Sequence, residues 1–145
     1  MKYLLALLAS SLLNSCRADS GEAMLKTYTR PELLDYLTVA FKESEGYKRV
    51  ECDGFGGKNA VKACFVTNNP PLEIDSLLKE FEDSGLELLQ NWMTTGASTD
   101  KVYSYNGEHN YLVGVAFVKT ENPINKRYQN QNLSEVMTIY VDKGY

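Results

Sequence analysis

The chain has 145 residues, of which 43% are hydrophobic and 23% are charged, and its formal net charge is −4. This length suits a single domain with a usable core, and the composition indicates neither a disordered chain nor a fibrous repeat. Proteins that bind nucleic acids usually carry a basic face. Lysine and arginine form no cluster in this sequence, so we expect no nucleic-acid partner.

The first residues are organised like a cleavable export signal. Lys2 supplies a positive charge, residues 3–13 are rich in leucine and alanine, and small and polar residues follow from Ser15. This order is typical of signal peptides. A membrane span needs about 20 apolar residues, and this run is shorter. We therefore expect residues 1–15 to be a signal peptide rather than a buried N-terminal helix, and the mature protein to work outside the cytoplasm.

The segment Leu13-Asn14-Ser15-Cys16 resembles the lipobox of bacterial lipoproteins. Leu13 and Ser15 fit that motif, whereas Asn14 stands where a smaller residue is usual. The resemblance, which covers only the signal, implies that Cys16 becomes the lipid-modified first residue of a protein anchored to a membrane of the bacterial envelope. Ordinary cleavage after Ala18, which would give a secreted protein, is the alternative.

The cysteines predict one disulfide in the mature protein. The chain contains three cysteines, and Cys52 and Cys64 remain whether Cys16 carries lipid or is removed with the signal. Residues 47–53 and 60–67 read as two strands that flank a glycine-rich turn. A Cys52–Cys64 disulfide is permitted by export and would stabilise the fold by about 3 kcal/mol. The hairpin register that we expect pairs Cys52 with Cys64 and Val50 with Val66.

Two amphipathic helices are predicted. The first runs from about residue 30 to residue 45, because Thr29 and Glu32 have capping-box spacing and apolar residues recur at helical spacing after them. The second helix begins at a pair of prolines (residues 70–71) and ends at Gly85. Its apolar face consists of Ile74, Leu77, Leu78 and Phe81.

The remaining domain reads as strands. They are expected at residues 86–93, 101–105, 108–119 and 134–142, with a polar loop at about 120–132. Asn106-Gly107 suits a two-residue hairpin turn. Residues 111–118 are apolar on both faces, which is typical of a central strand. Gly114 and Ala116 share one of these faces, where small residues would let a helix approach closely.

The order of these elements predicts the fold class. Residues 16–28 read as a short tether, and residues 29–145 read as a single domain. Its order is helix, hairpin, helix and then about four strands. We therefore expect an α+β domain in which two helices pack on a mainly antiparallel sheet of about five to six strands.

The two-residue turn also defines a candidate binding face. It would pair Tyr105 with Glu108 and Tyr103 with Asn110. Tyrosine brings contact area at a low entropic cost, so we expect this face to be at least partly exposed and to contact a partner. The alternative is that the tyrosines pack under a helix. The opposite face, which we expect in the core, consists of Val102, Tyr111, Val113, Val115 and Phe117.

The candidate catalytic and cofactor motifs in the sequence are weak. The glycine-rich turn at residues 54–59 departs from the phosphate-loop pattern and leads into a strand. His109, the only histidine, reads as an exposed turn residue. Carboxylate pairs such as Glu51 and Asp53 read as solvated charge. We therefore expect no catalytic residue, no cofactor and no metal site.

These features favour a non-catalytic binding or accessory protein of the bacterial envelope. The partner would be a protein or a glycan of the envelope, and lipid on Cys16 would attach the protein to a membrane. An inhibitor of a hydrolase is one form that such a protein could take. The alternative is a small cell-wall or polysaccharide hydrolase that uses a pair of carboxylates.

Overall fold

The computed structural model describes residues 28–52, 57–69, 71–120 and 134–144. The predicted signal peptide, Cys16, most of the tether and most of the loop predicted before the last strand lie outside these residues. The described elements, in chain order, are α2 (Arg30–Glu43), β1 (Tyr47–Val50), β2 (Val61–Thr67), the 3₁₀ helix η1 (Pro71–Ile74), α3 (Asp75–Asp83), β3 (Glu87–Thr95), β4 (Ser98–Asn106), β5 (Asn110–Lys119) and β6 (Glu135–Lys143).

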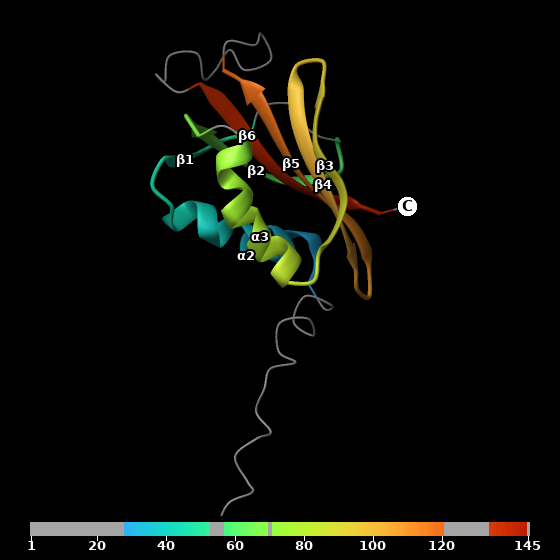
Figure 1. Ribbon diagram of the computed structural model, residues 1–145. Coiled ribbons are helices and arrows are strands. Elements are labelled where there is room, and N and C mark those ends of the chain that lie inside the picture. The colour runs from blue at the N-terminus through green and yellow to red at the C-terminus, as the bar shows by residue number, and fades with distance from the viewer. Residues whose placement is uncertain (1–27, 53–56, 70, 121–133, 145) are drawn as a thin grey trace, which may run out of the picture.

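The strands form one six-stranded sheet in the order β1-β2-β6-β5-β4-β3, and every neighbouring pair is antiparallel. Helices α2 and α3 lie on the same face of this sheet (Figure 1). The α+β prediction, with two helices on an antiparallel sheet, is therefore confirmed. Strands β1 and β3 form the two edges of the sheet.

Helix α2 begins where the capping box predicted it. The Glu32 carboxylate accepts hydrogen bonds from the Thr29 backbone N–H (2.8 Å) and the Thr29 hydroxyl (2.6 Å). These bonds lower the pKa of Glu32. The helix ends at Glu43, and Gly46 follows with a φ of 93°. The signals at its two ends set the length of α2, and its buried face packs against the sheet.

The second predicted helix is divided in two. The chain first forms the 3₁₀ helix η1 and becomes α-helical only from Asp75. Gly85 ends α3 with a φ of 93°, and the Leu86 N–H donates to the Phe81 carbonyl (3.0 Å). This is the pattern of a helix that terminates at a left-handed glycine. Leu78 and Phe81 are buried against the sheet.

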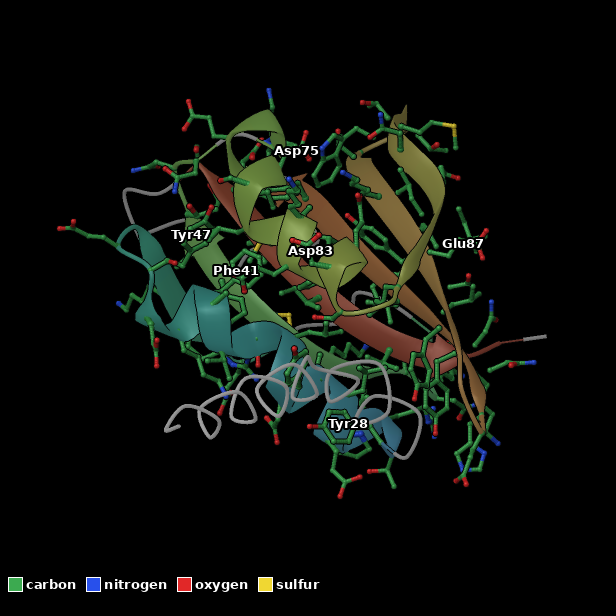
Figure 2. The ribbon with its side chains drawn as sticks, turned by 60° about the horizontal axis from the view of Figure 1, so that its bottom comes forward. Tyr28, Phe41, Tyr47, Asp75, Asp83 and Glu87 are labelled. Carbon is green, nitrogen blue, oxygen red and sulfur yellow. A yellow bond between two sulfur atoms is a disulfide. The ribbon has the colours of Figure 1, made fainter. Side chains whose placement is uncertain are left out.

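The core lies between the helices and the sheet, and aromatic rings join its parts. The centre of the Phe41 ring in α2 lies 6.0 Å from the centre of the Phe65 ring in β2 and 6.4 Å from that of the Phe81 ring in α3. Phe81 also lies 5.7 Å from Tyr103 of β4. Phe41 lies between α2 and α3 (Figure 2). The two helices therefore share one core.

The predicted central strand is confirmed, because β5 lies between β4 and β6 and is buried along most of its length. The expectation that a helix approaches Gly114 is wrong. Val113 and Val115 belong to the core that the helices cover, so Gly114 faces the other side of the sheet. A Cβ atom at Gly114 would collide with the ring of Tyr140. The missing side chain makes room for a neighbouring tyrosine.

The register gives the sheet two ends. The near end is the end of the sheet that holds the β4–β5 turn and the start of α2. There, Arg30 Nη1 lies 4.0 Å from Oδ1 of Asp142 in β6. Tyr28 precedes this helix (Figure 2). We call the far end the one that holds the β3–β4 turn and the cross-strand pair of Lys119 and Glu135. The two ends carry different polar groups.

Candidate functional site

The candidate binding face predicted from the sequence does not exist as one surface. Tyr103 is 0% exposed and Tyr105 is 3% exposed. Burial raises the pKa of both phenols. Neither hydroxyl has a hydrogen-bond partner within the described ranges. The expectation that these two tyrosines form an exposed contact surface is therefore wrong, and both belong to the core.

The cause is the register of the β4–β5 hairpin. Asn106 pairs with Asn110, so three residues rather than two lie between the strands. Tyr105 consequently pairs with Tyr111, and Tyr103 pairs with Val113. The tyrosines therefore share the helix-covered face with residues that we expected on the opposite face. Four of those predicted core residues are buried, namely Tyr111, Val113, Val115 and Phe117, and Val102 is half-buried.

Glu108 and Asn110, the other two candidate binding residues, are exposed at the near end. They line an open cavity of about 490 Å³ together with Arg30, His109 and Lys143. The His109 ring lies 5.8 Å from the Tyr111 ring, which is stacked on Tyr105 at 5.7 Å. His109 is exposed, as we expected of a turn residue. This cavity is polar and shallow, and it carries both signs of charge.

The predicted disulfide between Cys52 and Cys64 is confirmed, with Cα atoms 5.2 Å apart. The register expected for it is wrong by two residues, because Val50 pairs with Cys64 and Lys48 pairs with Val66. Cys52 lies just beyond the end of β1 at Val50 and reaches Cys64 from there. The bridge ties the end of the edge strand β1 to the neighbouring strand β2.

The predicted lipidation site, Cys16, lies outside the described residues. Asp53 of the Glu51/Asp53 pair lies outside them as well. Helices in the described part of the chain are too short or too polar to cross a membrane. Within the same residues, no group of three or more His, Cys, Asp or Glu side chains could hold a metal ion.

Exposed apolar side chains gather on the edge strand β3. Leu88 is 40% exposed, Leu89 is 55% exposed and Met93 is 50% exposed. The pairing of β3 with β4 shifts register twice, between Leu88 and Gln90 and between Gln90 and Met93. We call Leu88, Leu89 and Met93 the β3 strip. The sequence offers only a faint signal for it, a run of apolar residues in which strict alternation fails.

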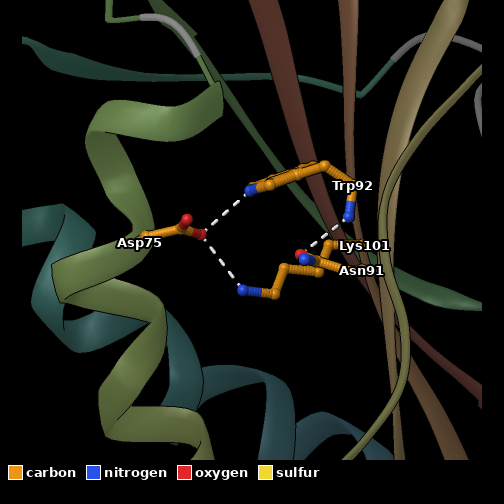
Figure 3. Close-up of polar contacts among 4 residues, drawn as sticks. All are labelled: Asp75, Asn91, Trp92 and Lys101. Carbon is orange, nitrogen blue, oxygen red and sulfur yellow. Dashed lines mark hydrogen bonds and ion pairs between the residues drawn. The ribbon is translucent and has the colours of Figure 1, made fainter.

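A polar clip holds β3 and β4 to the start of α3 (Figure 3). Asp75 Oδ1 accepts hydrogen bonds from Trp92 Nε1 (2.9 Å) and from Lys101 Nζ (3.0 Å). The Lys101 ammonium lies 5.7 Å from the centre of the Trp92 ring and 5.8 Å from that of Tyr103. Lys101 is buried, so its charge is balanced by one carboxylate and two aromatic rings. These polar groups support the structure of the domain.

A second, smaller cavity of about 250 Å³ lies at the far end. Glu135 and Lys119 line it from neighbouring strands, and Thr94 and Thr99 line it from the β3–β4 hairpin. One carboxylate oxygen of Glu135 is buried and has no hydrogen-bond partner in the described structure. Sequence reasoning missed this group, because a single glutamate at the start of a strand carries no signal of its burial.

Comparisons with protein-family models, with curated proteins and with solved structures find no match to this chain. No residue therefore takes a role from a relative. The described surface offers three candidate features, which are the near-end cavity, the β3 strip and the far-end cavity. Of these, only the β3 strip presents several large apolar side chains to solvent.

Proposed function

We propose that this protein is exported, is anchored to the bacterial envelope by lipid on Cys16, and binds a partner protein without catalysing a reaction. The contact would be made by the β3 strip. The observation that carries the proposal is the exposure of Leu88, Leu89 and Met93 on one edge strand. Leu88 pairs with Tyr103 on the helix-covered face and Met93 pairs with Asp100 on the opposite face, so the strip follows the edge of the sheet rather than one of its faces. A row of large apolar side chains exposed along one edge strand would suit contact with a partner protein that wraps this edge.

The geometry of β3 favours contact through side chains. A partner that adds a strand to an edge needs a regular row of free backbone groups. The two register shifts in β3 interrupt that row, as bulges do at the protected edges of many sheets. The apolar side chains nevertheless remain in water, which points to a partner surface with a complementary apolar patch. For this reason we favour a protein partner over a glycan at this strand.

The disulfide supports export. Disulfides persist mainly in proteins outside the reducing cytoplasm, and Cys52 and Cys64 are bridged. Anchoring through Cys16 follows from the resemblance of residues 13–16 to a lipobox. A stable anchor needs a second acyl chain or a second contact with the membrane. Lipid on Cys16 would be the first attachment to the envelope, and binding of the domain to an envelope protein would be the second.

The geometry favours binding over the alternative of glycoside hydrolysis. That reaction needs two carboxyl groups on either side of the scissile bond. Among the described residues, the near-end cavity is lined by one carboxylate, Glu108, and the far-end cavity by one, Glu135. The two cavities lie at opposite ends of the sheet. Asp142 is a second carboxylate at the near end, but it lies beside Arg30 and does not line the cavity.

Matched charge substitutions test the role of the β3 strip. We expect Leu89→Glu and Met93→Glu to reduce the amount of partner captured from native envelope by tenfold or more. Val39→Glu on α2 is the control, because Val39 is 47% exposed and lies on another element. Equal capture by all three variants would contradict the proposed surface.

Intact mass tests the anchor. The membrane-extracted protein should begin at Cys16 and carry diacylglycerol, and Cys16→Ser should release the protein from the membrane fraction. A soluble product that begins at Asp19 would show ordinary cleavage and contradict lipidation. The outcome for the β3 strip is independent of this result, because capture can be measured with either form.

A further inference from the structure

The far-end cavity brings together a small set of complementary polar groups. Lys119 and Glu135 are direct cross-strand partners in β5 and β6. Thr94 and Thr99 are cross-strand partners in β3 and β4, and their hydroxyl oxygens lie 3.0 Å apart. All four line the cavity, together with Phe117 of β5. Gly96 and Ala97 of the β3–β4 turn also line this cavity.

Glu135 has an unused capacity to accept hydrogen bonds. Its Oε2 atom is buried and has no partner among the described residues. Burial raises the pKa of Glu135, and the positive charge of Lys119 opposes this shift. A buried acceptor without a partner is destabilising. The last torsion of a glutamate is soft, so a small rotation can present this oxygen to a donor in the cavity.

The charges of the cavity restrict the class of ligand. Glu135 would repel a free anion in this cavity, and Lys119 would repel a free cation. A hydroxyl group both donates and accepts hydrogen bonds, so neighbouring hydroxyls on one ligand can bond to the Glu135 carboxylate and to the Lys119 ammonium at the same time. The volume of about 250 Å³ is below the range of about 300–1,000 Å³ typical of drug-sized ligands. One small ring fits this size.

We propose that the far-end cavity binds the ring of a neutral sugar, with Glu135 accepting and Lys119 donating hydrogen bonds to adjacent hydroxyls. Thr94 and Thr99 would contact the same ring from the hairpin. The ring could belong to a free monosaccharide or to the end of a glycan chain. This site goes beyond the proposed protein contact, since it uses the cavity and not the β3 strip.

Amide chemical shifts measure this binding directly. The disulfide-bonded protein is titrated with glucose, with N-acetylglucosamine and with the N-acetylglucosamine tetramer. We expect the amides of Gly96, Ala97, Thr99 and Glu135 to shift, and those of residues 107–110 at the near end to stay in place. Tighter binding of the tetramer than of the monomer would assign the ligand to a glycan chain, and equal binding would assign it to a free sugar. Shifts at residues 107–110 alone, or none with any sugar, would overturn the proposal.

Two variants and three small ions test the chemistry. Glu135→Gln should weaken sugar binding about tenfold, because a bond to a charged acceptor is lost, and Thr99→Val should weaken it about fivefold. Glu108→Gln, at the near end, is the control and should bind as the unmodified protein does. If Glu135→Gln does not fold, Thr99→Val alone decides. Unchanged affinity in Thr99→Val and Glu135→Gln, or shifts with glycine, methylammonium or acetate but not with sugars, would overturn the ligand class. Met93→Glu should bind sugar normally, which separates this test from that of the β3 strip.

Discussion

The two edge strands of the sheet are opposite cases. β1 has four residues, its central side chains are the charged Lys48 and Arg49, and the disulfide holds its end. β3 has nine residues and exposes Leu89 and Met93. Proteins usually protect sheet edges with short strands and charged side chains. β1 follows both rules, whereas β3 follows neither and relies on two breaks in register.

This difference indicates which edge is suited to contact. The Arg49 guanidinium lies 5.1 Å from the centre of the Phe65 ring, so the charged edge also takes part in packing. In β3, the polar clip holds Trp92 on the inward face, while the side chains of the β3 strip remain exposed to water. β3 is thus anchored through Trp92, while Leu88 on the helix-covered side and Met93 on the opposite side are exposed along its edge.

The largest effect is expected when a core side chain of β4 is removed. Tyr103→Ala should lower the free energy of unfolding by about 3–5 kcal/mol, because a large buried ring leaves a cavity. Urea denaturation measures the loss. Tyr36→Ala is the matched control, since Tyr36 is 42% exposed. A change of less than about 0.5 kcal/mol for Tyr103→Ala, the range of ordinary surface substitutions, would contradict the burial of this ring.

The next effect concerns the other edge. The double variant Cys52→Ala/Cys64→Ala should lower the free energy of unfolding by about 3 kcal/mol, because the unfolded chain regains the freedom that the bridge removes. Reducing agent should destabilise the unmodified protein similarly and leave the variant unaffected. Capture of the partner under native conditions should persist in the variant. Loss of capture in folded variant protein would mean that β1 takes part in the contact.

A smaller effect is expected at the polar clip. Asp75→Ala removes the acceptor for Trp92 and Lys101 and should lower the free energy of unfolding by about 2 kcal/mol. Trp92 is the only tryptophan, so its fluorescence reports the change directly. We expect the emission to shift to longer wavelength as the indole gains access to water. An unchanged spectrum and unchanged stability would show that the clip does not hold β3.

The smallest effect is a pH dependence at the far end of β6. The folded-state pKa of Glu135 is raised above its ordinary value of 4.5 by burial. The folded protein therefore binds the proton more tightly than the unfolded chain, and stability falls as pH rises through this region. Glu135→Gln should be more stable than the unmodified protein at neutral pH, and this advantage should disappear below about pH 4.5. An advantage that does not vary with pH would contradict this assignment.

Local signals in the sequence predicted most of the fold. The capping box at Thr29 and Glu32 placed the start of α2, and the glycines at positions 46 and 85 placed the ends of both helices. Each of these signals acts within a few residues of the chain, where backbone geometry and one or two side chains decide the outcome. The fold class followed from the order of the elements.

The register of the strands was not predictable from local signals. The errors in the predicted registers determined which of the proposed sites the structure supports. The β1–β2 register was wrong by two residues, which preserves the faces, so the Cys52–Cys64 bridge forms as predicted. The β4–β5 register was wrong by an odd number of residues, which exchanges the faces. Tyr103 and Tyr105 therefore moved from the expected surface into the core. The β3 strip and the environment of Glu135 depend on strand order, which one sequence does not give.

Site-specific photo-crosslinking in intact cells compares the two edges most directly. A photoreactive phenylalanine analogue is placed at position 89 or 93 on β3, and at position 48 or 49 on β1 as the control. All four side chains are exposed, so the domain should fold with each replacement. We predict a defined crosslinked product from positions 89 and 93 and none from positions 48 and 49. Crosslinks of equal yield from both edges, or from β1 alone, would contradict the claim that β3 is the binding edge.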